Sequence, residues 1–221
     1  MNHSSRNCNF FELWEKYLSS HKAIAVIRSS QLETGIAMAH AVADGGFKLI
    51  EITWNSDRPE ILISSLRKQL PSCLIGAGTI LDSLQLQQAV SAGAQFLFSP
   101  HFNQNLWELA LNRYKIPLIP GALSPTEIVT AWQAGAKIIK LFPINIMGGA
   151  SYIRSLQGPL AQVSLIPTGG VTVDNARELI DAGAIAVGLS GNLFLTALVS
   201  QHNWRGITQR AKMLLDSIHA T

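Results

Sequence analysis

The sequence has little of what marks a disulfide-stapled, metal-binding or membrane-spanning protein. Only two cysteines, Cys8 and Cys73, occur in 221 residues, and they lack CxxC spacing. This usage favours reduced thiols and a cytoplasmic location over a disulfide framework. The six histidines show no spacing typical of metal ligands, so we expect no structural or catalytic metal. The apolar runs fall short of the ~20 residues that a membrane-spanning helix needs, so we expect no membrane partner.

Charge is also sparse, because Asp, Glu, Lys and Arg make up 14% of the residues and leave a net charge of +3. No basic run and no alternation of basic and aromatic residues stands out, so we expect no nucleic-acid partner. The stretch from Met1 to Cys8 is polar and lacks the apolar segment of a secretory signal. These absences argue against a nucleic-acid-binding or secreted protein.

Hydrophobic residues are plentiful, at 48% of the chain, and they occur in eight runs of strand length. Helix-like stretches of about ten to fifteen residues separate these runs, which indicates a parallel sheet covered on both faces. The expected strands are Ala23–Arg28, Lys48–Ile52, Cys73–Gly76, Gln95–Ser99, Pro117–Pro120, Lys137–Phe142, Ser164–Pro167 and Ile185–Leu189.

A glycine motif recurs where helices should end, and its glycines are spaced by 48, 42 and 48 residues. Glycine just past a helix supplies the left-handed residue that ends it. Each interval holds two strand–helix units, so the repeat predicts an α/β fold of the (β/α)8 TIM-barrel type. We expect one domain over residues 1–221, with a helix at 9–20, the barrel at 23–200 and a helix at 207–218. The repeated glycines are Gly45, Gly93, Gly135 and Gly183.

In such a barrel the active site lies at the carboxyl ends of the strands, where Glu51 ends the second and Lys140 ends the sixth. Inward side chains of alternate strands share layers, so both can face one cavity. One interpretation is a structural salt bridge. The other is catalytic, since a desolvated lysine can form a Schiff base and a carboxylate can shuttle the protons. The pattern alone leaves both open.

Glycine-rich loops follow the seventh and eighth expected strands, at Thr168-Gly169-Gly170 and Ser190-Gly191-Asn192. Loops at these two places form the phosphate site of many TIM barrels, where backbone N–H groups point at the anion. Each loop alone also fits a tight turn, but both together favour a phosphate site.

With these residues assembled, the chain resembles the 2-keto-3-deoxy-6-phosphogluconate / 4-hydroxy-2-oxoglutarate (KDPG/KHG) aldolases, which are class I, Schiff-base enzymes. The resemblance runs from about Ala23 to Phe194. The motifs that carry it are Glu51-Ile52-Thr53, Ile75-Gly76-Ala77-Gly78-Thr79, Phe98-Ser99-Pro100, Pro120-Gly121, Ile139-Lys140-Leu141-Phe142-Pro143 and Pro167-Thr168-Gly169-Gly170-Val171.

The resemblance implies that Lys140 forms the Schiff base and that Glu51 is the general acid and base. It implies that no metal or organic cofactor is needed, and that the enzyme is a cytoplasmic homotrimer acting on a keto-acid phosphate. The remaining implied contacts are Arg28, Thr79, Pro100 and Thr168 for the substrate and Gly169, Gly170, Ser190 and Gly191 for its phosphate.

Two positions depart from the family pattern. Asn55 stands where gluconate-type members commonly carry an arginine, which makes this stretch more similar to the galactonate-type branch. The order Ser190-Gly191 reverses the family's Gly-Ser pair. His101, next to Pro100, has two interpretations, a side chain that enters the pocket and a solvated loop histidine, of which the second is the more common.

The expected reaction cleaves a 2-keto-3-deoxy-6-phospho sugar acid to pyruvate and glyceraldehyde 3-phosphate. A further candidate substrate is 4-hydroxy-2-oxoglutarate, which would give pyruvate and glyoxylate. Two alternatives stay open. One is a sugar-phosphate epimerase that uses Glu51 as base, and the other is a non-catalytic barrel that binds a metabolite.

Overall fold

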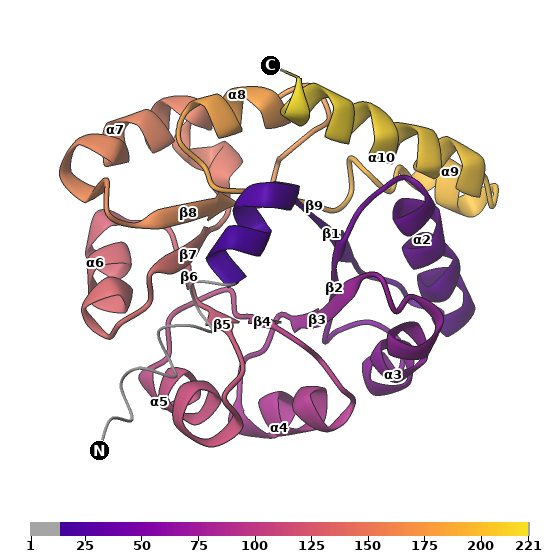
Figure 1. Ribbon diagram of the computed structural model, residues 1–221, viewed down its shortest axis with the longest axis horizontal. Coiled ribbons are helices and arrows are strands. Elements are labelled where there is room, and N and C mark those ends of the chain that lie inside the picture. The colour runs from indigo at the N-terminus through magenta and orange to yellow at the C-terminus, as the bar shows by residue number, and fades with distance from the viewer. Residues whose placement is uncertain (1–13, 221) are drawn as a thin grey trace.

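The computed structural model describes residues 14–220, in which parallel strands follow one another around a ring with the helices outside (Figure 1). All strand pairs are parallel, so the chain has the expected α/β fold with a curled parallel sheet. The strands are β1 (Ala23–Ile27), β2 (Leu49–Thr53), β3 (Leu74–Gly78), β4 (Leu97–Phe98), β5 (Leu118–Ile119), β6 (Gly121–Ala122), β7 (Ile138–Leu141), β8 (Ser164–Pro167) and β9 (Val187–Leu189).

The strands form a six-stranded sheet in the order β5-β4-β3-β2-β1-β9 and a three-stranded sheet in the order β6-β7-β8. Pro120 separates β5 from β6, because proline has no N–H for the ladder, although its carbonyl still accepts from the N–H of Lys140. Isolated parallel bridges, Leu165 to Ala184 and Thr168 to Gly188, lie between β8 and β9. Eight of the nine strands in the described part of the chain therefore overlap the eight expected runs, and β6 lies just beyond the fifth run, Pro117–Pro120.

Side chains along each strand alternate between two buried clusters, as the two-residue period of a strand requires. On β7, Ile138 belongs to the inner cluster, whereas Ile139 and Leu141 pack outward against the helices. On β2, Leu49 is inner and Ile50 is outer. Lys140 lies two residues after Ile138, and Glu51 lies two residues after Leu49. The side chains of Lys140 and Glu51 therefore also point inward.

Polar side chains cap the amino ends of several helices. Ser124 and Glu127 form a capping box at the start of α6, and Asp82 accepts from the N–H of Gln85 at the start of α4. The helices are α2 (Leu32–Asp44), α3 (Pro59–Gln69), α4 (Ser83–Ser91), α5 (Gln104–Glu108), α6 (Pro125–Gln133), α7 (Ala150–Leu160), α8 (Ala176–Asp181), α9 (Thr196–Ser200) and α10 (Trp204–His219), with a π-helical turn η1 (Leu109–Tyr114) and a 3₁₀ turn η2 (Ile144–Met147).

The expected left-handed glycine just past a helix is confirmed at three of the four repeat positions and is wrong at the first. Gly93, Gly135 and Gly183 have φ of +92°, +104° and +109°, as residues that end a helix in the left-handed region do. Gly45 has φ of −76°, and the left-handed residue is Gly46. A Cβ on Gly45 would lie 2.4 Å from the Cβ of Ala211 in α10, so Gly45 serves the packing of α10 on α2.

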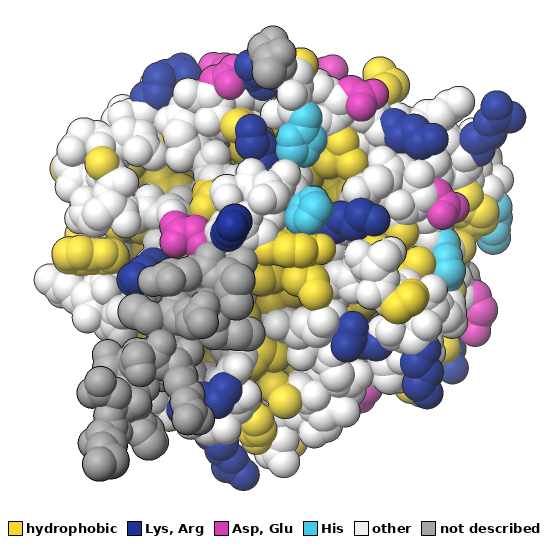
Figure 2. All heavy atoms as spheres, viewed as in Figure 1, with side chains coloured by type: hydrophobic (Ala, Val, Ile, Leu, Met, Phe, Trp, Pro, Cys, Tyr) yellow, Lys and Arg dark blue, Asp and Glu magenta, His cyan; other side chains and the backbone are white. Residues whose placement is uncertain are grey.

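A helix at residues 14–21 precedes β1 and crosses the middle of the ring in Figure 1, over the amino ends of the strands. Trp14 and Leu18 are buried there, and the Trp14 ring lies 4.9 Å from that of Phe96. Residues 9–13 of the expected helix lie outside the described part of the chain. Figure 2 shows this face as a mixed surface on which the visible cationic and anionic side chains are scattered. Within residues 14–220, no helix combines the length and hydrophobicity needed to cross a bilayer.

Candidate active site

Lys140 and Glu51 form a buried ion pair at the carboxyl ends of β7 and β2. The Lys140 Nζ lies 3.7 Å from Glu51 Oε1, and the two side chains are 7% and 2% exposed. The separation is an ion-pair distance, longer than a hydrogen bond. The structure therefore brings together two residues that lie 89 positions apart in the sequence, as the shared inward phase of their strands predicts.

Desolvation dominates the electrostatics of Glu51. Its burial raises the pKa of the carboxyl group, and the positive charges of Lys140 and Arg28 act in the opposite direction with the smaller effect. Glu51 Oε1 is buried and makes no hydrogen bond within residues 14–220. A carboxylate in these surroundings takes up a proton more readily than one in water, as a group that exchanges protons with a bound intermediate must.

Two aromatic rings flank the Lys140 ammonium group. Its Nζ lies 5.3 Å from the centroid of Phe98 and 5.5 Å from that of Phe142, within the range of a cation–π contact. Phe98 is buried, whereas Phe142 is 37% exposed. The lysine amine is thus buried beside one aromatic ring of β4 and one ring that follows β7.

Glycines on two strands permit close approaches at this site, Gly78 to the Glu51 carboxylate and Gly121 to the Pro100 backbone. A Cβ on Gly78 would lie 1.7 Å from Glu51 Oε1, so the carboxylate fills the volume of the missing side chain. Gly121 is the ladder neighbour of Lys140 on β6, and its own Cβ position lies 2.3 Å from the Pro100 carbonyl. Sequence reasoning placed both glycines in family motifs but did not assign them this role. The sequence pattern that could have indicated this role is that both glycines stand at inward-facing positions near the ends of their strands.

Thr79 and Thr168 lie at the ends of β3 and β8. Thr79 has φ of +59°, a strained backbone conformation for a β-branched residue, of the kind that clusters at functional sites. Thr168 is buried, and its Oγ1 occupies the place where a Cβ on Gly188 would lie, at 2.5 Å. Both expected pyruvate-contacting threonines are therefore at the mouth of the sheet.

Arg28 lies at the end of β1 and is exposed. Its Nε donates to the Oδ1 of Asn55, at 3.1 Å, in the loop after β2. The positive charge of Arg28 lowers the pKa of Glu51, against the larger effect of burial. Asn55 thus orients the guanidinium of Arg28.

The two glycine-rich loops lie side by side, joined by the bridge between Thr168 and Gly188. Gly169 and Gly170 have φ of +83° and +87°, which L side chains rarely adopt. A Cβ on Gly170 would lie 2.3 Å from the Asn145 side chain, so the loop also sits closely against η2. Ser190 is half-buried and Gly191 exposed at the end of β9.

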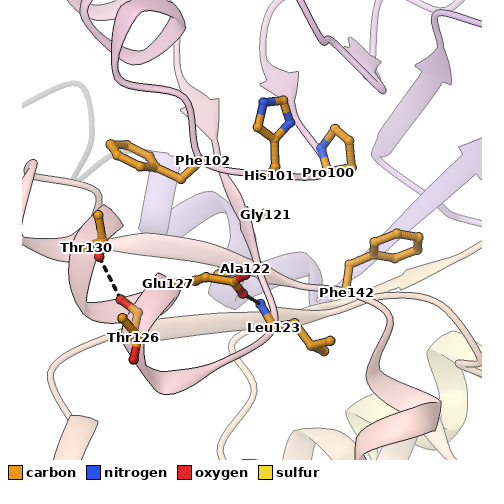
Figure 3. Close-up of a pocket in the computed structure, with 10 residues that line it drawn as sticks. All are labelled: Pro100, His101, Phe102, Gly121, Ala122, Leu123, Thr126, Glu127, Thr130 and Phe142. Carbon is orange, nitrogen blue, oxygen red and sulfur yellow. Dashed lines mark hydrogen bonds between the residues drawn. The ribbon is translucent and has the colours of Figure 1, made fainter.

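A pocket of about 320 Å³ is lined by residues that follow β4, by β6 and by Phe142 beyond β7, and Lys140 and Glu51 are not among its lining residues (Figure 3). Pro100, His101 and Phe142 line it, and Figure 3 shows His101 and Phe142 on separate walls. The His101 Nδ1 lies 3.3 Å from the Oγ of buried Ser99. On the α6 side, Glu127 accepts from the N–H of Leu123 and belongs to the capping box. The structure thus brings Pro100 and His101 to this pocket, whereas Arg28 and the two glycine-rich loops lie at the ends of β1, β8 and β9.

Within residues 14–220, no group of three or more His, Cys, Asp or Glu side chains could hold a metal ion. The polar groups that converge at the mouth of the sheet are one amine, one buried carboxyl, one guanidinium and two threonine hydroxyls. This set can attack a carbonyl, exchange protons and bind anions.

Comparisons with known proteins agree with that chemistry. A family model described as KDPG and KHG aldolase matches residues 14–210. The 2-dehydro-3-deoxy-phosphogluconate aldolase of Treponema pallidum is 35% identical over 159 residues, which are 72% of this chain and 75% of that protein. The KHG/KDPG aldolase of Escherichia coli K12 is 34% identical over 166 residues, which are 75% of this chain and 78% of that one.

A solved structure extends the likeness to the fold. The crystal structure of KDPG aldolase from Legionella pneumophila, with pyruvate captured as a covalent carbinolamine intermediate, aligns with a TM-score of 0.84 at 29% identity. The alignment covers 90% of this chain and 97% of that one. The family match, the identity of the relatives and the buried lysine–glutamate pair agree, and we conclude that this chain belongs to the KDPG and KHG aldolase family.

Proposed function

We propose that this protein is a class I aldolase that cleaves a 2-keto-3-deoxy-6-phospho sugar acid to pyruvate and glyceraldehyde 3-phosphate. The observation that carries the proposal is the buried ion pair, 3.7 Å between Lys140 Nζ and Glu51 Oε1, in a chain of this aldolase family. An amine at the mouth of a curled parallel sheet is placed to meet a keto acid, and the raised pKa of Glu51 suits proton exchange beside it.

The reaction begins when Lys140 passes a proton to Glu51, a step that desolvation of the carboxylate favours. The neutral amine attacks the C2 ketone, and loss of water gives an iminium ion. Glu51, again ionised after giving its proton to the leaving water, removes the proton of the C4 hydroxyl group. The C3–C4 bond breaks, its electrons move into the iminium, and glyceraldehyde 3-phosphate leaves. Glu51 returns a proton to C3 of the enamine, and hydrolysis frees pyruvate and Lys140.

Surrounding residues bind the two ends of the substrate in this proposal. Thr79, Pro100 and Thr168 border the pyruvate part, and Arg28 meets an anionic end. Gly169, Gly170, Ser190 and Gly191 hold the phosphate through their backbone N–H groups and the serine hydroxyl, and positive φ at both strand-end glycines supports a close approach of that backbone.

The proposal extends to the architecture. We propose that the chain is one domain and a closed (β/α)8 barrel, supported by the bridges between β8 and β9 and by the hydrogen bond from the Lys140 N–H to the carbonyl of Pro120, between the two sheets. We also propose a cytoplasmic homotrimer, for which exposed Ile61 and Leu84 on neighbouring helices α3 and α4 offer an apolar surface. Light scattering of the purified protein tests the trimer.

Borohydride trapping tests the mechanism. Incubation with pyruvate and borohydride should add one reduced pyruvate to Lys140, located by peptide mass analysis. An epimerase that used Glu51 as base, or a non-catalytic barrel, would give no adduct, and that result would refute the proposal. A panel of phosphogluconate-type, phosphogalactonate-type and 4-hydroxy-2-oxoglutarate substrates then assigns the preferred substrate.

A further inference from the structure

Arg210 reaches from helix α10 into the loop that follows β9. Its Nε and Nη2 donate to the carbonyl oxygen of Asn192, at 3.1 and 2.8 Å, and Nη2 also donates to Asn192 Oδ1, at 3.1 Å. The guanidinium is half-buried. Asn192 follows Ser190 and Gly191, so this arginine holds one of the two loops proposed to bind phosphate.

The same asparagine connects that loop to the other one. Asn192 Oδ1 accepts from the N–H of Val173, at 2.9 Å, in the segment that continues from Gly169 and Gly170. The ladder joins the two loops at their base, through the bridge between Thr168 and Gly188. Asn192 joins them again further along, so the spacing of the loops depends on an amide oxygen that Arg210 also holds.

The charge of Arg210 is not neutralised by a neighbouring carboxylate. Arg177 pairs with Asp181 and Arg154 with Glu178, whereas no carboxylate among residues 14–220 lies within 4.0 Å of Arg210. Its partners are the two neutral oxygens of Asn192. Because arginine stays charged at any working pH, a positive charge remains beside the candidate anion site.

The packing of α10 on its neighbouring helices does not account for the contacts between Arg210 and Asn192. Arg177 of α8 donates to the carbonyl oxygens of Ser217 and Ala220 at the carboxyl end of α10. Thr208 donates to the carbonyl of Ala41, so α10 is also held on α2, the helix beside it in Figure 1. Arg210 adds contacts to a loop at the ends of the strands rather than to another helix.

We propose that Arg210 is a positioning residue for the phosphate-binding site. Acting through Asn192, it holds the loops after β8 and β9 at the spacing that lets their N–H groups meet one phosphate, and its charge favours the dianion. This inference rests on the proposed function, because it requires that the two loops bind the phosphate of the substrate.

Steady-state kinetics of Arg210→Ala, Arg210→Lys and Asn192→Ala test the role, with Arg177→Ala as the matched control on the other end of α10. We expect KM for the phosphorylated substrate to rise about tenfold in the three test variants, since loosening a binding group lowers affinity by such factors. The competitive inhibition constant of inorganic phosphate should rise with it. Lysine should not replace Arg210, because an ammonium group lacks the planar fork that contacts both Asn192 oxygens.

A phosphate-free readout separates positioning from a general loss of structure. The rate of borohydride trapping with pyruvate should change less than the KM for phosphorylated substrate in each test variant. Arg177→Ala should lower Tm without raising that KM. Equal losses in both readouts, a KM effect in Arg177→Ala, or unchanged kinetics in Arg210→Lys would overturn the inference. If wild-type protein forms no lysine adduct, the proposed function fails instead.

Discussion

Replacing Gly78 by alanine should disable the site while leaving the protein folded. The new Cβ would lie 1.7 Å from Glu51 Oε1, 2.3 Å from its Cδ and 2.7 Å from its Cγ. Non-bonded heavy atoms at their optimal separation stand about 3.5–4.0 Å apart, so the carboxylate has to move by more than ~1 Å. Glu51 is buried and its Oε1 lies 3.7 Å from the Lys140 ammonium group, so little free space is available to it.

The expected loss of kcat follows from the displacement of the Glu51 carboxylate. A misplacement of about 1 Å in a catalytic group can lower the rate by ~10²-fold, so we expect kcat of Gly78→Ala to fall about a hundredfold. Overpacking a buried position costs roughly 1–3 kcal/mol, which lowers Tm by several degrees in a chain of this size. Pyruvate release, coupled to lactate dehydrogenase and NADH, measures kcat, and scanning calorimetry measures Tm.

Gly158→Ala in α7 is the matched control, because its Cβ would meet nothing within 4 Å and its φ is not positive. That variant should keep wild-type kcat, and its Tm should stay within a few degrees of the wild-type value, because the ring of Pro159 disfavours a Cβ on the helical residue before it. Wild-type kcat in Gly78→Ala would refute the argument that this glycine makes room for the catalytic carboxylate.

Three further predictions concern the charged groups. Lys140→Met should abolish borohydride trapping and lower the rate of pyruvate release at least ~10⁴-fold, because no other amine in the described residues is paired with Glu51. Residual turnover with a pyruvate adduct on another residue would contradict this prediction. Glu51→Gln should change how stability depends on pH. The raised pKa of Glu51 means that the folded protein holds its proton to higher pH than the unfolded chain, so wild type loses stability as pH rises above the ordinary value of 4.5. Tm of Glu51→Gln should therefore increase relative to wild type over that range, and a constant difference would contradict the reasoning. Arg28→Ala should raise KM more than it lowers kcat, and it should shift the acid limb of the pH–rate profile to higher pH, because Arg28 lowers the pKa of Glu51. Asn55→Ala should have the same effects at smaller size, since Asn55 only orients the guanidinium. An unchanged pH–rate profile in Arg28→Ala would refute this coupling.

Local patterns were enough to predict much of the fold. The apolar runs gave the strands within a few residues, because the pattern depends on neighbours two positions away. The two-residue strand β4 was overestimated as Gln95–Ser99. There the side chain of Gln95 accepts from the N–H of Ile75 and leaves only Leu97 and Phe98 in the regular strand.

The sequence by itself determined that Lys140 ends an apolar strand, that Glu51 ends another, and that two glycine-rich loops follow the last two strands. Only the tertiary structure decided what surrounds them. The volume missing at Gly78 is occupied by Glu51, Gly45 meets Ala211 of a helix at the other end of the chain, and Arg210 reaches Asn192. Strand phase fixes the direction of a side chain, whereas its neighbours, burial and pKa depend on which distant elements the sheet brings beside it, and no local spacing encodes those contacts.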